Sequence, residues 1–174
     1  MHRYSELAMR CAALTQGNLQ EAREHILREL QTSGATMLVK ALQAIELQQA
    51  MVAVGMVAMF DAAIQDALQC PDGFVAGMKI IEGAGDMDLA RKFDNLRLAI
   101  NVLKHGVGRS HDALLLRQSE LPFRVGVPGV AFDEGDVSEV NTLVLADGAF
   151  LDYCAEVVIE VAELINRERP MTFL

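Results

Sequence analysis

Apolar side chains recur at helical spacing along most of this 174-residue chain. In residues 2–16 they stand three or four positions apart, which predicts a first helix. Gly17-Asn18 is expected to interrupt that helix. Asn18, with Glu21 three residues later, forms a box-like start for a second helix, which is expected to end near residues 33–34.

A long helix is predicted over residues 37–69, where only Gly55 weakens the pattern, at a cost of roughly 1 kcal/mol. The section from Met51 to Phe60 is apolar nearly all round. A helix of this kind is buried on more than one side. It is therefore either the central helix of a bundle or also a contact with a second subunit.

Two further helices are predicted after a turn signal at residues 70–73. The short one covers residues 74–81. The longer one covers residues 86–105, with Asp86 as its N-cap and Gly106 just beyond its C-terminus. One side of the longer helix carries an apolar stripe, which consists of Leu89, Phe93, Leu96, Ile100 and Leu103.

The C-terminal third changes character twice. Ser110 is expected to cap a short helix, and residues 119–136 then alternate and contain two prolines. That segment is either two short strands joined by a turn or an ordered extended loop. A final helix is predicted over residues 138–167, where apolar residues again stand three or four positions apart.

These elements predict an all-α fold, an up-and-down helical bundle of four to five main helices with a short extended or β-hairpin-like insertion near residues 119–136. The length fits a single domain over residues 1–174. Within it, residues 1–34 form the N-terminal helices and residues 37–168 form the core of the bundle.

Composition and charge narrow the class of protein. Hydrophobic residues make up 52% of the chain and aromatic residues 5%, which suits helix-on-helix packing. The net charge of −9 disfavours nucleic acid or an anionic membrane as a partner of the whole surface, so a polyanion would need a local basic patch. The most apolar stretch, residues 51–63, is too short to span a bilayer, and we expect no membrane association.

The three cysteines are widely separated and form no disulfide framework, which fits a reducing cytosol. With no secretion signal at the N-terminus, the prediction is a cytoplasmic protein. Cys11 and Cys154 are expected to be small core residues, while Cys70 stands at a turn.

Metal and cofactor motifs are absent from the sequence. The histidines do not pair with one another or with glutamate at ligand spacing, so we predict neither a zinc site nor a di-iron site. The segment Gly106-Val-Gly108-Arg109-Ser110 could hold an anion on backbone N–H groups, but it does not match a phosphate-binding P-loop. No cofactor is predicted.

One cluster concentrates polar, chemically capable side chains. Residues four, seven and eight positions apart share a helix face. By that rule one face of the 86–105 helix carries a candidate catalytic group, which consists of Arg97, Asn101, Lys104 and His105. A candidate ligand-binding group follows across a glycine loop and consists of Arg109, Ser110 and His111.

Two interpretations of this cluster remain open. In the functional one, His105 acts as a general acid or base on a phosphodiester, Arg97 and Lys104 stabilise its charge, and Asn101 orients a hydroxyl. In the structural one, the cations of the last turn stabilise the helix C-terminus, and Arg97 pairs with an acidic residue such as Asp94.

The segment Asn101-Val-Leu-Lys104-His105-Gly106, near the end of a helix, resembles the motif of the HEPN superfamily. Phe60-Asp61, late in a long apolar helix, resembles the second helix of that family, which often bears an acidic residue. Members of that superfamily are compact helical bundles, often dimeric, and many are metal-independent ribonucleases of toxin–antitoxin and defence systems. The resemblance implies a homodimer in which two copies of the His105 helix face one another. It also implies RNA or a nucleotide as a ligand and an antitoxin-like protein as a partner.

The sequence departs from the family pattern at one position, because Ile100 stands where the signature arginine is expected. Arg97 lies one turn earlier, outside the usual spacing. The leading hypothesis is therefore a HEPN-like dimer with weak or no catalysis that binds RNA, a nucleotide or a protein partner around the Asn101–His111 surface. The alternatives are a metal-independent ribonuclease that uses His105 and a plain protein-interaction module.

Overall fold

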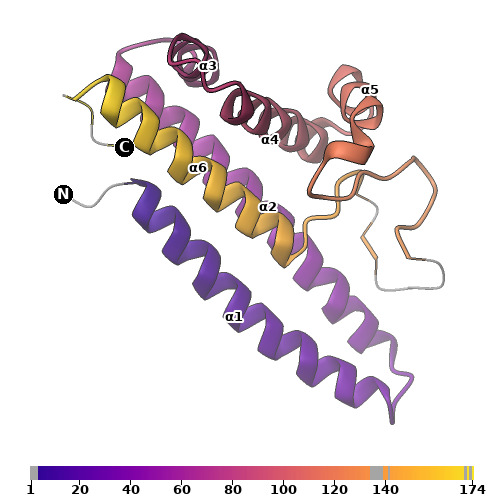
Figure 1. Ribbon diagram of the computed structural model, residues 1–174. Coiled ribbons are helices and arrows are strands. Elements are labelled where there is room, and N and C mark those ends of the chain that lie inside the picture. The colour runs from indigo at the N-terminus through magenta and orange to yellow at the C-terminus, as the bar shows by residue number, and fades with distance from the viewer. Residues whose placement is uncertain (1–3, 134–138, 141, 171, 173) are drawn as a thin grey trace.

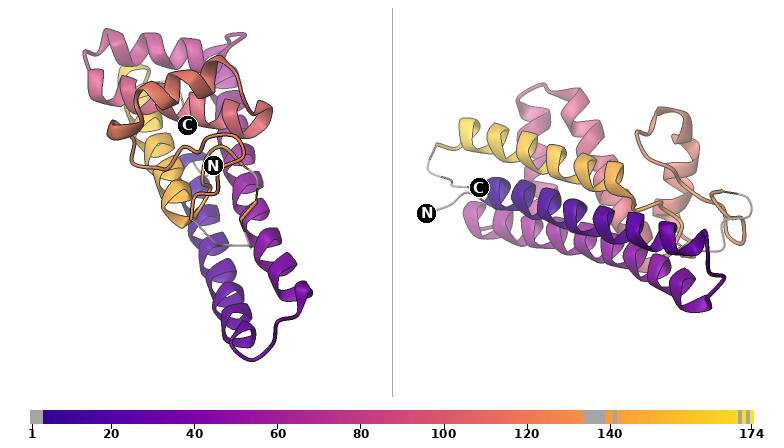
Figure 2. Two further views of the ribbon diagram at one scale, coloured as in Figure 1. Left: turned by 90° about the vertical axis from the view of Figure 1, so that its right-hand side faces the viewer. Right: turned by 90° about the horizontal axis from the view of Figure 1, so that it is seen from below.

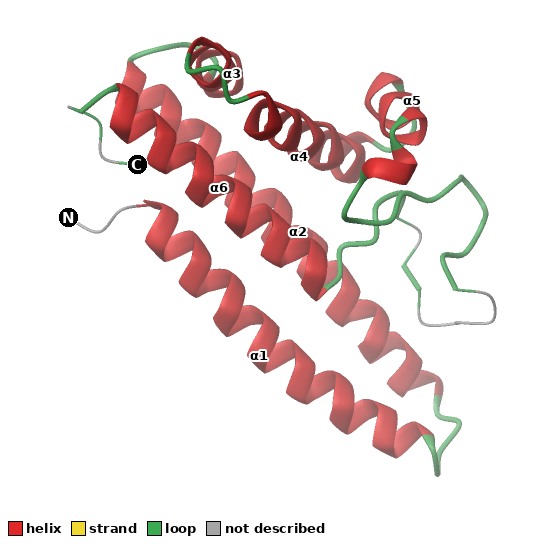
Figure 3. Cartoon of the chain, viewed as in Figure 1, coloured by secondary structure: helices red, strands yellow, loops and turns green. Residues whose placement is uncertain are grey.

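The computed structural model describes residues 4–133, 139, 140, 142–170, 172 and 174. Its described residues are predominantly helical, as Figure 3 shows, which confirms the all-α prediction. The elements in chain order are α1 (Tyr4–Leu30), α2 (Thr36–Leu68), α3 (Gly73–Gly83), α4 (Met87–His105), α5 (Arg109–Leu116), the 3-10 helix η1 (Gln118–Glu120) and α6 (Gly148–Glu168).

Three long helices form the main body of the molecule (Figure 1). α1 and α2 run antiparallel as a hairpin, and α6 packs against both. α3 and α4 cover α2 and α6 from another side, and α5 packs beside the end of α4. In the right-hand view of Figure 2, α2 lies along the lower edge of the molecule.

Large apolar side chains from these helices fill one core. Phe60 of α2, Phe93 of α4 and Phe150 of α6 are all fully buried. The predicted stripe on α4 is confirmed, because Leu89, Phe93, Leu96 and Ile100 are buried and Leu103 packs against the same cluster. Tyr4 joins α1 to α2, since its ring stacks on Phe60 and its hydroxyl donates to the Met56 carbonyl oxygen over 2.6 Å.

The N-terminal prediction was wrong in one respect: α1 is a single helix and Gly17-Asn18 does not interrupt it. The helix continues because its neighbour α6 supports it there. The side-chain amide of Gln16 donates to the carbonyl oxygen of Gly148 over 2.7 Å and to Asp152 Oδ1 over 2.9 Å. Tertiary contacts of this kind outweigh the weak helix propensity of glycine.

The cysteine predictions have mixed outcomes. Cys154 is buried in the core, as expected. Cys11 is exposed, so its expected place in the core was wrong. The helix turns Ala8 and Ala12 inward, and those small residues occupy the contact that the spacing assigned to Cys11.

The insertion and the last helix also differ from prediction. The described part of residues 119–136 forms no hairpin, and the final helix begins at Gly148, where Asp147 Oδ1 accepts a hydrogen bond from Phe150 N over 2.9 Å. Val125 instead pairs with Val144 in an isolated antiparallel bridge, and the described residues among 121–133 and 142–147 form an extended loop. The expected helix start at residue 138 lies outside the described residues.

Both ends of α4 match their prediction. Asp86 Oδ1 accepts from Leu89 N over 3.1 Å, and Gly106 takes a positive φ of 73° just past the last turn. α5 begins at Arg109 rather than being capped by Ser110, because the chain bends sharply at Gly108 and that residue takes the N-cap position.

The far end of the α1–α2 hairpin extends past the N-terminal end of α6 (Figure 1). The last buried residue of α1 is Leu19 and the first of α2 is Leu42. Between them the hairpin is only two helices thick, and residues 31–37 are all exposed.

Candidate functional site

The polar face of α4 lines a cleft of about 760 Å³ between α3, the start of the α2–α3 turn and the second half of α2. Three of the four α4 residues predicted to act together, Arg97, Asn101 and Lys104, lie in it. The opposite walls carry Lys79 and Glu82 of α3 and Asp61 of α2. The spacing rule therefore brought together most of the cluster, and it missed the residues that other helices contribute.

The junction of α2 and α3 is fixed by tight polar contacts. Asp61 Oδ1 accepts from Phe74 N over 2.9 Å, and Asp61 Oδ2 accepts from the Gln65 amide over 2.7 Å. Gly73 allows this close approach, because a Cβ there would clash with the Asp61 backbone oxygen and lie 2.6 Å from Oδ1. Asp72 caps α3 by accepting from Val75 N over 2.9 Å.

Asp94 is the centre of an ion-pair network at the other side of the cleft. It pairs with Arg97 at 2.6 Å and with Arg117 at 2.8 Å, and Arg117 also donates to Asn95 Oδ1 over 2.9 Å. Burial raises the pKa of the Asp94 carboxyl, but the hydrogen bonds and charges of both guanidinium groups outweigh it and lower the pKa below its usual value. Arg97 is thus paired with Asp94, one of the partners proposed in the structural interpretation.

Four other polar side chains of the cleft have no partner among the described residues. Within the described part of the chain, the side chains of Lys79, Lys104 and Asn101 take part in no ion pair or hydrogen bond, and neither does Glu82. Lys79, Lys104 and Glu82 are exposed, and Asn101 is half-buried. The cleft therefore presents two free ammonium groups and one amide, with a single free carboxylate.

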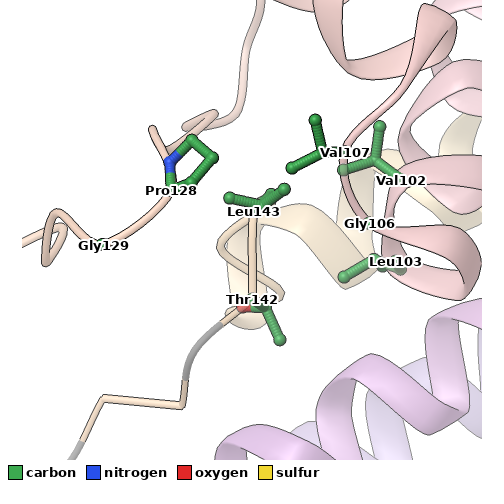
Figure 4. A pocket seen from close by; sticks show the side chains of 8 residues that line it. All are labelled: Val102, Leu103, Gly106, Val107, Pro128, Gly129, Thr142 and Leu143. Carbon is green, nitrogen blue, oxygen red and sulfur yellow. The ribbon is translucent and has the colours of Figure 1, made fainter.

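His105 lies outside this cleft. It is exposed in the last turn of α4. Other residues at that end of α4 line a smaller pocket of about 250 Å³ together with the loop (Figure 4). The residues that line the smaller pocket are uncharged, and they include Val102, Val107, Pro128 and Leu143. Of the four predicted α4 residues, His105 is therefore the one that does not line the cleft.

The second predicted group, Arg109, Ser110 and His111, does not form one surface. Arg109 is exposed and Ser110 is half-buried. His111 is only 2% exposed, and its Nε2 lies 2.8 Å from the carbonyl oxygen of Gly126, which ties α5 to the extended loop. Its ring is therefore occupied by a contact within the chain.

Asp61 was named from the sequence only through the HEPN resemblance, and the residues of α3 were not named. Asp61 interrupts an otherwise apolar run, and a lone carboxylate there indicates a polar contact on a buried helix. Val75, Lys79 and Glu82 stand at spacings of four and three and so share one face of α3. A search for a second polar face on a neighbouring helix finds them.

The described residues include no group of three or more His, Cys, Asp or Glu side chains placed to hold a metal ion. One helix, Thr36–Leu68, is long and apolar enough to cross a membrane by length and composition.

Comparison with models of known protein families, with curated proteins and with solved structures finds no match to this chain.

Proposed function

We propose that the cleft between α2, α3 and α4 binds a phosphate-bearing ligand, a nucleotide or a short stretch of RNA, without cleaving it. The observation that carries this proposal is the state of the charged groups in the cleft. Lys79 and Lys104 have no partner within the described residues, whereas Asp61, Asp72 and Asp94 are each already engaged by donors of the protein.

Engaged carboxylates do not compete for the ligand. Asp61 and Asp72 accept backbone N–H groups of α3, and Asp94 is held by two guanidinium groups. The donors left over are two ammonium groups and the Asn101 amide, which suit the oxygens of a phosphate. Glu82 is the one carboxylate in the cleft that remains free, and it is exposed.

The apolar part of the cleft suits a base. Val75 is 50% exposed there, and Phe74 and Met78 line the same wall. Apolar side chains of this kind pack against the face of a nucleobase, while the polar groups hold the phosphate. The net charge of −9 makes a single nucleotide or a few phosphates a better fit than a long polyanion.

Two observations support binding without cleavage. His105 is not among the residues that line the cleft. Ile100, at the position of the HEPN signature arginine, is 4% exposed and belongs to the core. Both features support the HEPN-like, non-catalytic interpretation over the ribonuclease.

The test measures binding of fluorescent ATP and of a short labelled single-stranded RNA by fluorescence polarisation. We expect Lys104→Ala and Lys79→Ala each to weaken binding, and added salt to weaken it further, because the contacts are electrostatic. Arg10→Ala, an exposed cation of α1, is the matched control and should bind as the unmodified protein does. Binding that is equal in all three variants would contradict the proposal.

A second measurement separates binding from cleavage. The protein is incubated with the labelled RNA in EDTA, and the products are resolved by electrophoresis. We expect intact RNA. Cleavage that is lost in His105→Ala would replace the proposal with the ribonuclease.

A further inference from the structure

The outer face of α2 is apolar and exposed along most of its length. Its large exposed side chains are Met37 (79%), Leu47 (48%), Met51 (59%) and Met59 (63%). Ala44, Ala58 and Ala62 are exposed on the same face. At 3.6 residues per turn these positions cover about a third of the helix circumference. Large apolar faces of this kind mark interaction surfaces in proteins.

Gly55 lies in the middle of this face and has no role within the chain. A Cβ at Gly55 would meet no atom within 4 Å, so nothing in the chain requires a glycine there. Glycine is less favourable than alanine inside a helix. On this apolar face, the missing side chain at Gly55 leaves space that a side chain from outside can fill.

Two opposite charges bound the face. Lys40 and Asp66 are exposed, and neither side chain forms an ion pair within the described part of the chain. They stand about 39 Å apart along the helix axis, at a rise of 1.5 Å per residue. Every exposed residue of α2 between them is uncharged.

We propose that a second copy of this chain docks on this face, with the two α2 helices antiparallel and a two-fold axis that crosses the outer face at the level of residue 53 along the helix. In that arrangement the numbers of any two residues that face each other across the axis have the same sum. Met51 then enters the space beside the partner subunit's Gly55, and Leu47 meets the partner subunit's Met59. Lys40 reaches the partner subunit's Asp66, and the symmetry of the dimer makes each contact occur twice.

The charge pattern favours this occupant. An antiparallel pair brings each terminal ammonium to a carboxylate, whereas a parallel pair would place like charges together. The small residues Ala44 and Ala62 face one another in the antiparallel register and allow the helices to approach closely. In this one register the apolar side chains, the space at Gly55 and the end charges are all matched between the two copies.

A lipid bilayer fits the same face less well. α2 has the length and composition of a membrane span, but a third (33%) of its most apolar window is buried by the rest of the chain. Its neighbour α1 carries exposed charged side chains, including Glu6, Arg10 and Glu21. Insertion of α2 would bring these charges into hydrocarbon, which is costly.

This interface is separate from the cleft and from the His105 end of α4. Asp61 and Gln65 face the cleft from α2, while Met51 and Gly55 lie on its outer side. The proposal therefore does not depend on the proposed function, and ligand binding can fail without affecting it.

The experiment measures the mass of the intact protein by sedimentation equilibrium over a range of concentrations. We expect a dimer of twice the 19.0 kDa chain mass. Gly55→Leu should abolish it by filling the space that receives Met51. Gly17→Leu is the matched control, since Gly17 is an exposed helix glycine of α1 with no atom within 4 Å of its Cβ position, and it should remain dimeric.

Charge reversal tests the register. Lys40→Asp or Asp66→Lys alone should raise the dissociation constant on the order of tenfold or more, because two like-charge contacts replace two opposite ones. The double variant should restore the dimer. Circular dichroism of each variant confirms that the helices remain folded.

Three outcomes overturn the proposal: a monomer at every concentration, a dimer unchanged by Gly55→Leu, and single charge reversals that the double variant does not rescue. Flotation with phosphatidylcholine vesicles tests the lipid alternative. Flotation of the unmodified protein that Met51→Asp abolishes would identify lipid as the occupant and would also overturn the dimer.

Discussion

The cleft side and the outer side of α2 differ in how far their side chains find partners within the chain. On the cleft side, a polar residue inside an apolar helix is fully matched by the chain, because Asp61 binds Phe74 N and the Gln65 amide. On the outer side, apolar residues are exposed and the charges Lys40 and Asp66 have no partner within the described residues. The first side is complete in one chain and the second is not, so mutations should affect them differently.

The two glycines of this region give the sharpest contrast. Gly73→Ala should destabilise the protein by about 3 kcal/mol, because the new methyl group overlaps two oxygens of Asp61 and forces α3 away from α2. Urea unfolding followed by circular dichroism measures the loss. Gly83→Ala, at the open end of the same helix, is the control and should change the stability little. Equal effects of the two substitutions would mean that the α2–α3 junction is looser than its contacts indicate.

Asp94→Asn should cost about 2 kcal/mol at pH 7, because it leaves Arg97 and Arg117 without the charge that pairs them across the half-buried wall of the cleft. Asp88→Asn, which removes an exposed partner of Arg91, should cost much less. Unfolding by urea at neutral pH measures both changes.

The stability cost of Asp94→Asn should depend on pH. The folded-state pKa of Asp94 is lower than its unfolded value of about 4, so its contribution to stability is present above that value and is lost as the pH falls through the folded pKa. The stability difference between the unmodified protein and Asp94→Asn should therefore shrink below about pH 4. A difference that stays constant down to pH 2 would contradict the network.

Tyr4→Phe tests the seam between α1 and the inner side of α2 and should cost about 1 kcal/mol, the value of one hydrogen bond. Burial, and then the nearby Cys11 thiol, raises the pKa of Tyr4 to about 12. Because the folded pKa lies above the unfolded one of about 10, the stability that Tyr4 adds is full below pH 10 and is lost as the pH rises toward 12. Unfolding curves at pH 8 and pH 11 should show the cost of Tyr4→Phe falling.

Gly55→Ala should have the smallest effect and the opposite sign. Measured at concentrations where the protein is monomeric, it should stabilise the chain by about 0.5–1 kcal/mol, since alanine fits the open space and favours the helix. Gly17→Ala should stabilise to a similar extent. A loss of stability in Gly55→Ala alone would show that the chain itself needs the glycine.

Most of the fold was predictable because helical periodicity and capping residues are local. The bounds of α2 and α4, the Asp86 cap and the Gly106 terminus all follow from short-range rules. The errors fall where distant contacts decide the structure. The hydrogen bond of Gln16 to α6 supports α1 where Gly17 was expected to interrupt it. The cap of α6 is Asp147 and not a residue near 138.

The candidate site shows the same limit. Arg97, Asn101 and Lys104 share a face of one helix, so their spacing was enough to place them together. Lys79 comes from another helix, and no local rule links it to Lys104. The burial of His111 depends on where the extended loop meets α5, because its ring contacts the carbonyl oxygen of Gly126.

The thin end of the α1–α2 hairpin has a consequence for dynamics. Helices stay closed against hydrogen exchange mainly through the side chains that they bury. From Leu19 to Leu42 the hairpin has few such side chains, whereas α4 and the middle of α6 are surrounded. Amide protons near the tip should exchange through local opening well before those of α4. We therefore expect a stable base around α4 and α6, and a pair of helix ends that open and close without unfolding it.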